Sequence, residues 1–313
     1  MHEHDWLADR FEEHRSRLRG VAYRILGSLS EADDAVQDAW LRVSRAGAGG
    51  VENFGGWLMT IVARVCLNML ESRKSRREEP LETHVPDPIV GSAGGIDPEQ
   101  EALLGDSVGL ALLVVLDKLG PAERVAFVLH DVFGVPFDEV APIVGRSSAA
   151  TRQLASRARR RVRGSAIPDT DLARQRAVVD AFVAAARGGD FSALLAALDP
   201  DVLLRADGGP EPAAASGEAR GATTVARLVL TFARRLTGTL EPAVVNGAAG
   251  VVALDPDRRP LSVLGFTILR AKIVEIDILA DPVRLSRLDV LALAVDPQHP
   301  AAPLDAGAQP RHR

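Results

Sequence analysis

An arginine-rich segment near the middle of the chain has the residue types needed to bind DNA. Between Ser148 and Arg163 there are six arginines and no acidic residue. On a helical wheel, small and branched side chains share one side of this segment and polar side chains share the other. Arginine and glutamine can each bond two atoms of a guanine or adenine edge, and arginine also neutralises phosphates. The candidates for DNA contact are Ser148, Arg152, Gln153, Ser156, Arg157, Arg160 and Arg163.

The residues just before this segment complete a helix-turn-helix pattern. Residues 137–144 predict a bracing helix, and Gly145 can take the positive φ of a tight turn. Ser147 or Ser148 can cap the second helix, which in such a motif lies in the major groove. Pro142 stands past the first turn of the bracing helix, so we expect that helix to be short or kinked. The alternative is a basic helix that is merely solvated.

A second basic cluster lies at the end of a long helical pattern over residues 57–77. Residues 1–40 instead carry nine acids against five bases, and the whole chain has a net charge of −5. Two separated basic patches on an acidic chain predict two places of DNA contact, with acidic faces left for another partner. Two further helical patterns precede the long one: residues 6–26, and a helix that Ser30 would cap. A Gly-rich loop, residues 45–56, then leads to the long helix.

Length and composition restrict the class of protein. A chain of 313 residues suits two or three domains. The single cysteine, Cys66, excludes a disulfide framework and a thiolate zinc site, and we expect no metal and no cofactor. The N-terminus lacks a signal-peptide core, and no apolar run reaches the length of a membrane span. We therefore expect a cytoplasmic protein with no membrane partner.

Two blocks of the sequence resemble the extracytoplasmic-function (ECF) sigma factors of bacteria. Region 2 of that family is similar to RILGSLSEADDAVQDAWLRV followed by FGGWLMTIVARVCLNMLESRKSRR. Region 4 is similar to LDKLGPAERVAFVLHDVFGVPFDEVAPIVGRSSAATRQLASRARRRVR. The resemblance implies a region 2 helical bundle and a region 4 helix-turn-helix, with core RNA polymerase and promoter DNA as partners.

The resemblance also implies roles for particular residues. One face of the second helix would bind the clamp coiled coil of core RNA polymerase, through Asp34, Gln37, Asp38 and Leu41. The loop and the long helix would open and read the minus-ten promoter element, through Asn53, Phe54, Trp57, Arg64, Asn68, Arg73 and Lys74. The arginine helix would read the minus-thirty-five element with the DNA candidates already named.

After residue 168 the pattern changes to helices followed by short strands. A helix is expected over 171–187, a turn at Asp199-Pro200 and five strands from residue 202 to 279, which indicates an α+β domain with an antiparallel sheet. The segment FVAAARGGDFSALLAALDPDVLLRADGG, with later strands, resembles the cone-shaped SnoaL-like domain that sigma factors of the SigJ type carry. The resemblance implies a regulatory motif at Asp207, Gly208 and Gly209, although the lysine of the relatives has no counterpart beside it. A small-molecule ligand for this domain is left open.

The expected organisation is therefore a multidomain chain. Region 2 would span residues 6–77, region 4 residues 99–164 and the SnoaL-like domain residues 170–285, with a disordered tail over 296–313. Residues 78–98 contain Pro and Gly without periodicity and predict an extended, flexible linker. In this linker His84-Val85-Pro86-Asp87-Pro88 is the nearest match to a motif that in relatives includes a tryptophan.

Two other functions are weighed against a sigma factor. A SnoaL-like isomerase or cyclase needs an acid–base pair in its pocket. The domain offers Asp207 and Asp277, but its first histidine is His299 in the tail, so we expect no enzyme activity. A helix-turn-helix repressor with a ligand-sensing domain would leave the region 2 block unexplained. We expect the C-terminal domain to set the spacing of regions 2 and 4 in cis, in a direction that the sequence does not give.

Overall fold

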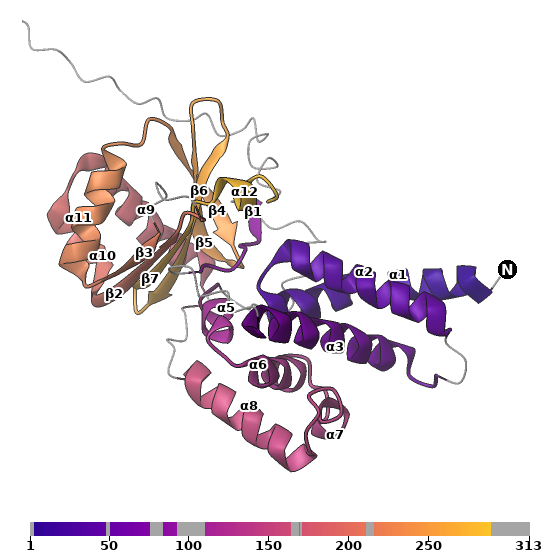
Figure 1. The fold of residues 1–313 in the computed structure, drawn as a ribbon. Helices are drawn as coiled ribbons and strands as arrows, with labels where there is room; N and C mark the ends of the chain where they lie inside the picture. Colours follow the sequence, from indigo (N-terminus) through magenta and orange to yellow (C-terminus); the bar gives the residue numbers. More distant parts are fainter. Residues whose placement is uncertain are drawn as a thin grey trace, which may run out of the picture.

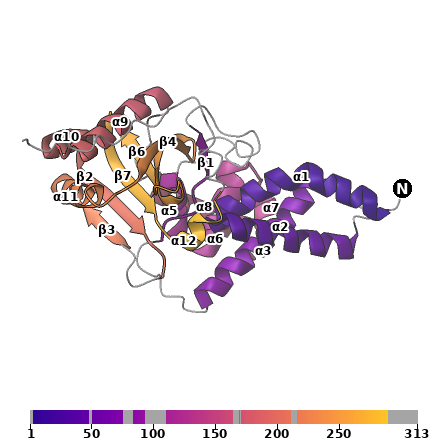
Figure 2. The ribbon, with the colours of Figure 1, turned by 90° about the horizontal axis from the view of Figure 1, so that it is seen from above.

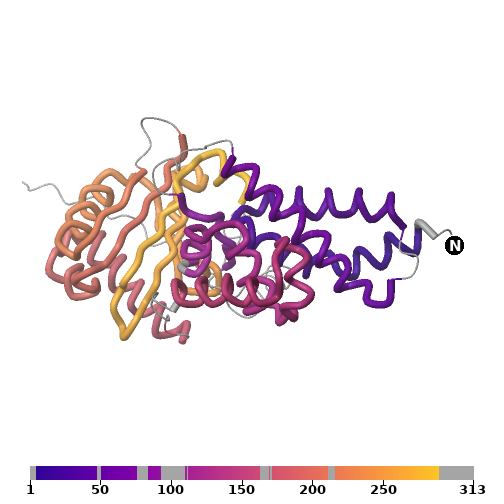
Figure 3. Tube along the Cα trace, turned by 60° about the horizontal axis from the view of Figure 1, so that its bottom comes forward, coloured from indigo at the N-terminus to yellow at the C-terminus, as the bar shows by residue number. Residues whose placement is uncertain are grey.

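The structure is a computed structural model that describes residues 3–47, 51–75, 84–92, 110–163, 169, 171–210 and 216–288. Its described part forms an N-terminal helical bundle, a smaller helical domain below it and a C-terminal domain built on a sheet (Figure 1). Figure 3 shows the N-terminal bundle and the C-terminal domain at opposite ends of the molecule, with the smaller helical domain in front of the middle in this view. The predicted tail over 296–313 lies outside the described residues.

The N-terminal bundle consists of α1 (Glu3–Leu26), α2 (Leu29–Ala46) and α3 (Phe54–Ser75). Gly27, at φ +74°, ends α1, and Ser28 caps α2 by accepting a bond from the backbone N–H of Glu31. The prediction that Ser30 caps α2 is therefore wrong by two residues, because the positive φ at Gly27 brings the next residue directly to the cap position.

The smaller helical domain has the predicted helix-turn-helix. The bracing helix α7 is a single turn that ends before Pro142, as expected from the missing N–H of proline. Gly145, at φ +63°, makes the turn, and the Ser147 hydroxyl accepts a bond from the Ala150 N–H at the start of α8. The elements in order are α5 (Leu110–Asp117), α6 (Pro121–Phe127), a π-helical turn (Val128–Val132), α7 (Phe137–Val140) and α8 (Ser148–Arg163).

The C-terminal domain is an α+β domain in which α9 (Leu172–Gly188), α10 (Phe191–Ala197) and α11 (Ala222–Ala233) cover one face of the sheet (Figures 1 and 2). A further helix of this domain is α12 (Pro282–Leu285). Its strands are β2 (Leu198–Asp207), β3 (Gly217–Arg220), β4 (Thr239–Val245), β5 (Ala248–Leu254), β6 (Pro260–Leu269) and β7 (Lys272–Leu279).

Two features of this sheet differ from the prediction. With β1 (Val90–Ser92) at one edge, the sheet order is β1-β4-β5-β6-β7-β2-β3. Strand β2 pairs with β7 in parallel, so the sheet is mixed and not wholly antiparallel. Asp199 and Pro200, expected in a turn, lie inside β2 at an irregularity in its register with β7. A bulge can hold a proline because it interrupts the ladder of hydrogen bonds.

The predicted flexible linker is partly an ordered element of the C-terminal domain. Residues 85–91 are all buried. Residues 90–92 form β1, which pairs with β4 at the edge of the sheet, Val90 opposite Val245. An edge strand offers unpaired N–H and C=O groups, and this segment satisfies them. The expectation of an extended chain holds for residues 84–92, whereas the expectation of mobility is wrong there.

The second face of the sheet does not face solvent. Side chains from β4 to β7, among them Val245, Val263 and Leu279, belong to the same hydrophobic core as the two helical domains. Leu110 of α5 packs against Gly265 of β6, where a Cβ would lie 2.8 Å from the leucine side chain. The helical domains therefore use the sheet as a packing surface.

Candidate nucleic-acid interface and interdomain contact

The outer face of α8 carries most of the predicted DNA-binding side chains in an accessible position. Those exposed are Arg152, Gln153, Ser156, Arg157 and Arg160, while Ser148 is half-buried. Thr151, Ala155 and Ala158 are fully buried on the opposite face and fix the rotation of the helix. Arg163 ends the helix, and its side chain is outside the described residues. The face predicted from the helical wheel is therefore the exposed face.

Two other arginines of α8 are engaged within the domain. The Arg159 Nε lies 2.5 Å from Asp131 Oδ1, and the Arg161 Nη1 lies 2.8 Å from Glu123 Oε2. These pairs tie α8 to the π-helical turn and to α6. The Arg152 guanidinium lies 5.6 Å from the centre of the Phe137 ring on α7. This cation–π contact holds Arg152 over the bracing helix without using its N–H groups.

The predicted polymerase-binding residues share one side of α2. Asp34, Gln37 and Leu41 are exposed, and 43% of the Leu41 surface is accessible. Asp38 is half-buried and accepts a bond from Arg42 Nη2 at 2.8 Å, one turn further on. An exposed leucine beside acidic residues is a surface suited to a partner with apolar and basic groups.

The structure divides the predicted minus-ten residues into two groups. Arg64, Asn68 and Lys74 are exposed on α3, and Trp57 is half-buried. Asn53 is also exposed, and its Oδ1 accepts a bond from the Gly56 N–H at the start of α3.

Two of the candidates are held inside the bundle. Phe54 is 8% exposed and packs near Trp6 and Trp57. Arg73 is half-buried and donates to Glu31 Oε1 at 3.0 Å. In this conformation Phe54 and Arg73 support the bundle instead of facing a ligand.

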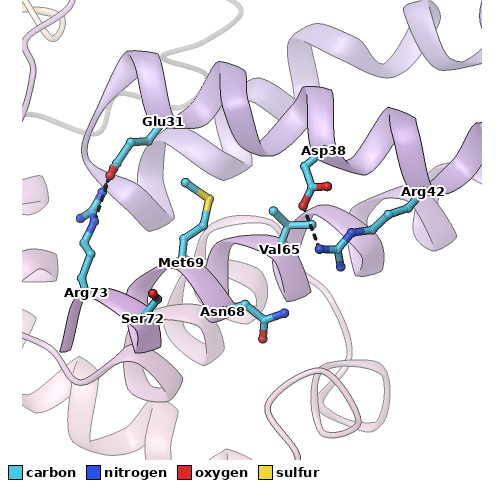
Figure 4. Close-up of a pocket in the computed structure, with 8 residues that line it drawn as sticks. All are labelled: Glu31, Asp38, Arg42, Val65, Asn68, Met69, Ser72 and Arg73. Atoms are coloured by element: carbon cyan, nitrogen blue, oxygen red, sulfur yellow. Dashed lines mark hydrogen bonds and ion pairs between the residues drawn. The ribbon is translucent and has the colours of Figure 1, made fainter. Parts of the chain in front are cut away.

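A hollow of about 380 Å³ lies between α2 and α3 (Figure 4). The Asp38–Arg42 pair stands at one end and the Glu31–Arg73 pair at the other, with Met69 between them. The remaining lining residues are Val65, Asn68 and Ser72. The lining of the hollow thus includes one polymerase candidate, Asp38, and two DNA candidates, Asn68 and Arg73.

Asp207 of the predicted regulatory motif binds the linker and α12. Its Oδ2 accepts bonds from the Val85 N–H at 3.0 Å and from Arg284 Nη1 at 2.7 Å. Its Oδ1 accepts a bond from the Gly209 N–H at 3.1 Å, which forms an Asx turn. Gly209 has φ +84°, and a Cβ there would lie 2.7 Å from the Asp281 carboxyl carbon, so glycine is required.

Arg284 connects the linker to this motif, and we call the group of Arg284, Asp87, Asp207 and Val85 the Arg284 contact. The guanidinium donates to Asp87 Oδ1 at 2.6 Å and to the Val85 carbonyl at 2.5 Å, in addition to Asp207. Burial alone raises the pKa of Asp207. Hydrogen bonds from His84 and Val85 and the charge of Arg284 outweigh this effect and hold that pKa below its usual value.

The same linker residues bind the N-terminal bundle. The Asp87 N–H donates to the Gly27 carbonyl at 2.9 Å, and Asp87 Oδ2 accepts the Leu29 N–H at 3.0 Å. The Tyr23 hydroxyl donates to the Asp87 carbonyl and accepts a bond from Asn246 Nδ2 at 3.1 Å. Burial raises the pKa of Tyr23, so the hydroxyl stays protonated. The His84–Pro88 segment therefore joins the bundle to the C-terminal domain through Asp87, without the tryptophan of the relatives.

Comparison with known proteins now decides the family. Sigma-70 region 2 matches residues 10–76 and Sigma-70 region 4 matches residues 109–162. A probable ECF RNA polymerase sigma factor, SigI of Mycobacterium tuberculosis, is 35% identical over 92% of this chain and 98% of its own length. The chain belongs to the ECF RNA polymerase sigma factors.

Two further comparisons extend the match beyond the sigma regions. The ECF sigma factor SigJ of M. tuberculosis is 39% identical over 77% of this chain and 78% of its own length. The crystal structure of M. tuberculosis SigJ superposes with a TM-score of 0.73 at 34% identity, covering 90% of this chain and 99% of that one. The family and the multidomain fold class expected from the sequence are confirmed.

Some residues of this sigma factor that join its parts were missed by sequence reasoning. Asn246 bonds Tyr23 of region 2 directly and Arg284 bonds the linker, yet none of the three stands in a motif of DNA-binding type. The signal that was available is the run Asp281-Pro282-Val283-Arg284, which puts an arginine in the short helix that Asp281 caps. Arg284 is the cation that lies beside Asp207 in this chain.

The acids considered for catalysis are both engaged with arginines. Asp277 Oδ1 accepts a bond from Arg205 Nε at 2.8 Å, and the same arginine lies 3.1 Å from Glu275. Burial raises the pKa of Asp277 to about 6 against the opposing charge of Arg205. Within the described ranges, no group of three or more His, Cys, Asp or Glu side chains could hold a metal ion. The described helices include none that is long and apolar enough to cross a membrane.

Proposed function

We propose that this sigma factor binds the clamp coiled coil of core RNA polymerase through α2 and reads promoter DNA through α3 and α8. We further propose that the C-terminal domain controls it in cis. The observation that carries the proposal is the Arg284 contact. It ties the C-terminal domain to the linker, and through Asp87 to region 2, in the same chain that presents the arginine face of α8.

Among the described residues, no carboxylate pairs with the exposed Arg152, Arg157 and Arg160 of α8, which supports DNA binding. Arg152, Gln153 and Ser156 lie toward the N-terminal half of the helix, from which base edges are reached. Arg157 and Arg160 lie further along and are placed for phosphates, which carry no sequence information. Region 2 would contribute Asn53, Trp57, Arg64, Asn68 and Lys74 to the minus-ten element, and Phe54 and Arg73 once their present contacts are released.

The α2 face supports polymerase binding because its acids are accessible. Asp34 and Gln37 are exposed about one helical turn apart on α2, and Leu41 adds an apolar group one turn further along the same side. Acids at the edge of an interface steer a basic partner, while an apolar centre adds affinity. Since core RNA polymerase is in the cytoplasm, the proposal places this protein there too.

Control in cis is supported by what the C-terminal domain contacts. Its sheet packs on α5 of region 4, and Asp87, just before the linker strand that joins this sheet, bonds the turn between α1 and α2 of region 2. A domain that binds both regions restrains how far apart they can move. Release of the Arg284 contact would therefore raise promoter binding. The proposal requires no small-molecule ligand, and it assigns no enzyme activity to the C-terminal domain.

Run-off transcription with core RNA polymerase, from the DNA upstream of the chain's own gene, tests the proposal. The Arg284→Ala variant should transcribe several-fold more than the wild type at matched concentration. Arg287→Ala, an exposed arginine on the turn after α12, serves as the control and should behave as the wild type. Point variants are preferable to truncation after residue 164, because truncation would expose the apolar α5 residues that the sheet covers.

Two results would contradict different parts of the proposal. Absence of transcription and of core binding by the wild-type chain would remove the sigma factor mechanism. Equal transcription by Arg284→Ala and the wild type would remove control in cis and leave the mechanism standing.

A further inference from the structure

Regions 2 and 4 pack directly against each other. Helix α6 lies on α3, and both α5 and the π-helical turn lie against α1 (Figure 1). The two promoter elements are about 25 base pairs apart, which is about 85 Å of B-DNA. Helices α3 and α8, with 22 and 16 residues, both lie against α6, and the two end to end with the width of α6 between them would span about 70 Å. The packing must therefore open before one chain reads both elements.

A buried arginine lies in the contact that has to open. Arg124 of α6 is 1% exposed. Its Nη1 donates to Asp117 Oδ1 at 2.9 Å, within region 4. Its Nε reaches the Arg24 carbonyl of region 2 at 3.5 Å, and its Nη2 has no hydrogen-bond partner among the described residues. A Cβ on Gly27 would lie only 3.1 Å from this Nη2, so the guanidinium is pressed against the turn of region 2.

Separation of regions 2 and 4 would affect the three guanidinium nitrogens of Arg124 differently. The bond to Asp117 lies inside region 4 and is kept when the regions separate. The contact with Arg24 is lost, but at 3.5 Å it is a weak one. The Nη2 gains water, and an unpaired buried donor is costly, more so on a charged group. Burial lowers the pKa of Arg124 despite the charge of Asp117, which agrees with a net cost of burying it.

We propose that Arg124 keeps the packing of region 4 on region 2 weak, so that the regions part readily once their restraint is released. The C-terminal domain is then needed as a restraint, because the packing is destabilised from within. The inference rests on the proposed function, since opening has a purpose only if both regions read DNA. Arg124 acts here as a positioning residue and no DNA contact is assigned to it.

The single cysteine of the chain reports this opening without any label having to be introduced. Cys66 is on α3, is fully buried and lies near Arg124. Its rate of reaction with a thiol reagent can be measured on the full chain, with neither DNA nor polymerase present. Separation of α6 from α3 would expose the thiol, so the rate follows the open fraction.

Arg124→Met replaces the guanidinium by an apolar side chain of similar length. Asp117 is 31% exposed at its side chain, so water can replace the lost partner. We expect Cys66 to react about fivefold more slowly, or slower still, than in the wild type. Arg161→Met is the matched control, because that side chain is 56% exposed and its partner Glu123 is also in region 4. Its rate should stay within about twofold of the wild type.

Arg124→Gln, neutral but polar, gives a second variant and should also react more slowly. Faster reaction of either Arg124 variant, with circular dichroism showing a folded chain, would mean that the arginine holds the packing together and would overturn the proposal. Rates equal to the wild type would overturn it as well, and so would rates that follow only the stability to urea. A slow reaction in a chain that fails to transcribe would count against the proposed function alone.

Discussion

On α8, Arg152, Arg157 and Arg160 project from the helix, and within the described ranges no carboxylate pairs with them. In the Arg284 contact the same kind of side chain is bound by two carboxylates and a carbonyl. Exposed arginines keep their binding capacity for a partner, so replacing them should change affinity and leave folding intact. Arg284 has already used its N–H groups, so replacing it should change the stability and the conformation of the chain.

The acidic face of α2 extends this comparison to charges of the opposite sign. Asp34→Arg should abolish detectable binding to core RNA polymerase, since a like charge placed in an interface costs several kcal/mol. The melting temperature should be nearly unchanged, because Asp34 is exposed. Asp9→Arg makes the same charge change at an exposed position of α1 and should retain binding. Pull-down with core polymerase and thermal denaturation measure both effects; an early-melting Asp34→Arg chain would show that the acid serves the fold.

Arg284→Ala tests the opposite half of the comparison. It leaves Asp87 and Asp207, both largely buried, without their cation, and should cost about 3 kcal/mol of unfolding free energy. Arg287→Ala should change it by less than about 0.5 kcal/mol. Urea denaturation of the full chain gives both values. If the two variants are equally stable, the Arg284 contact contributes nothing and the comparison with α8 fails.

The α8 face offers the next test, smaller in size. Arg152→Ala should weaken promoter binding by about 1–3 kcal/mol and relax the preference at one base position. Arg160→Ala should weaken binding evenly across sequences and reduce the salt slope by about one. Binding to a promoter and to single-base variants of it, at two salt concentrations, separates the roles. Loss of affinity in both without any change of preference would show that Arg152 contacts phosphate.

Local patterns in the sequence were enough to predict the helices and the exposed face of α8. The periodicity of Thr151, Ala155 and Ala158 determines which side of α8 is buried, and Pro142 determines where α7 ends. Phe54 and Arg73 were predicted as ligand-facing from their positions in a motif. Their burial and pairing depend on Trp6 and Glu31, which lie more than 40 residues earlier.

The order of residues 84–92 could not be predicted from the segment itself. Its composition has the Pro and Gly content of a linker, and its partners are the edge of a sheet formed by β4 and a turn at Gly27. Such partners appear only after the whole chain has folded. The parallel pairing of β2 with β7 was missed for the same reason, because the two strands are neighbours in the sheet but are separated in the sequence by β3, β4, β5 and β6.

Two aspartates in adjacent strands of the C-terminal domain give the last and smallest test. Asp207 pairs with Arg284 and has a lowered pKa, whereas burial raises the pKa of Asp277, beside Arg205, to about 6. An aspartate in the unfolded chain has a pKa of about 3.9. Between about pH 3.9 and pH 6, Asp277 binds more protons in the folded chain than in the unfolded chain. The contribution of Asp277 to stability therefore falls as the pH rises through this window.

Asp277→Asn removes this titration and should therefore gain stability relative to the wild type as the pH rises from 4 to 6. We expect a relative gain of about 1 kcal/mol, because the charge of Arg205 opposes protonation of its partner. Asp207→Asn is the control. With a lowered pKa, Asp207 contributes fully above about pH 4 and loses its contribution only as the pH falls further, so its difference from the wild type should stay constant over this window. Urea denaturation at each pH measures both; parallel profiles for Asp277→Asn and the wild type would mean that Arg205 holds Asp277 ionised throughout, as Arg284 does Asp207.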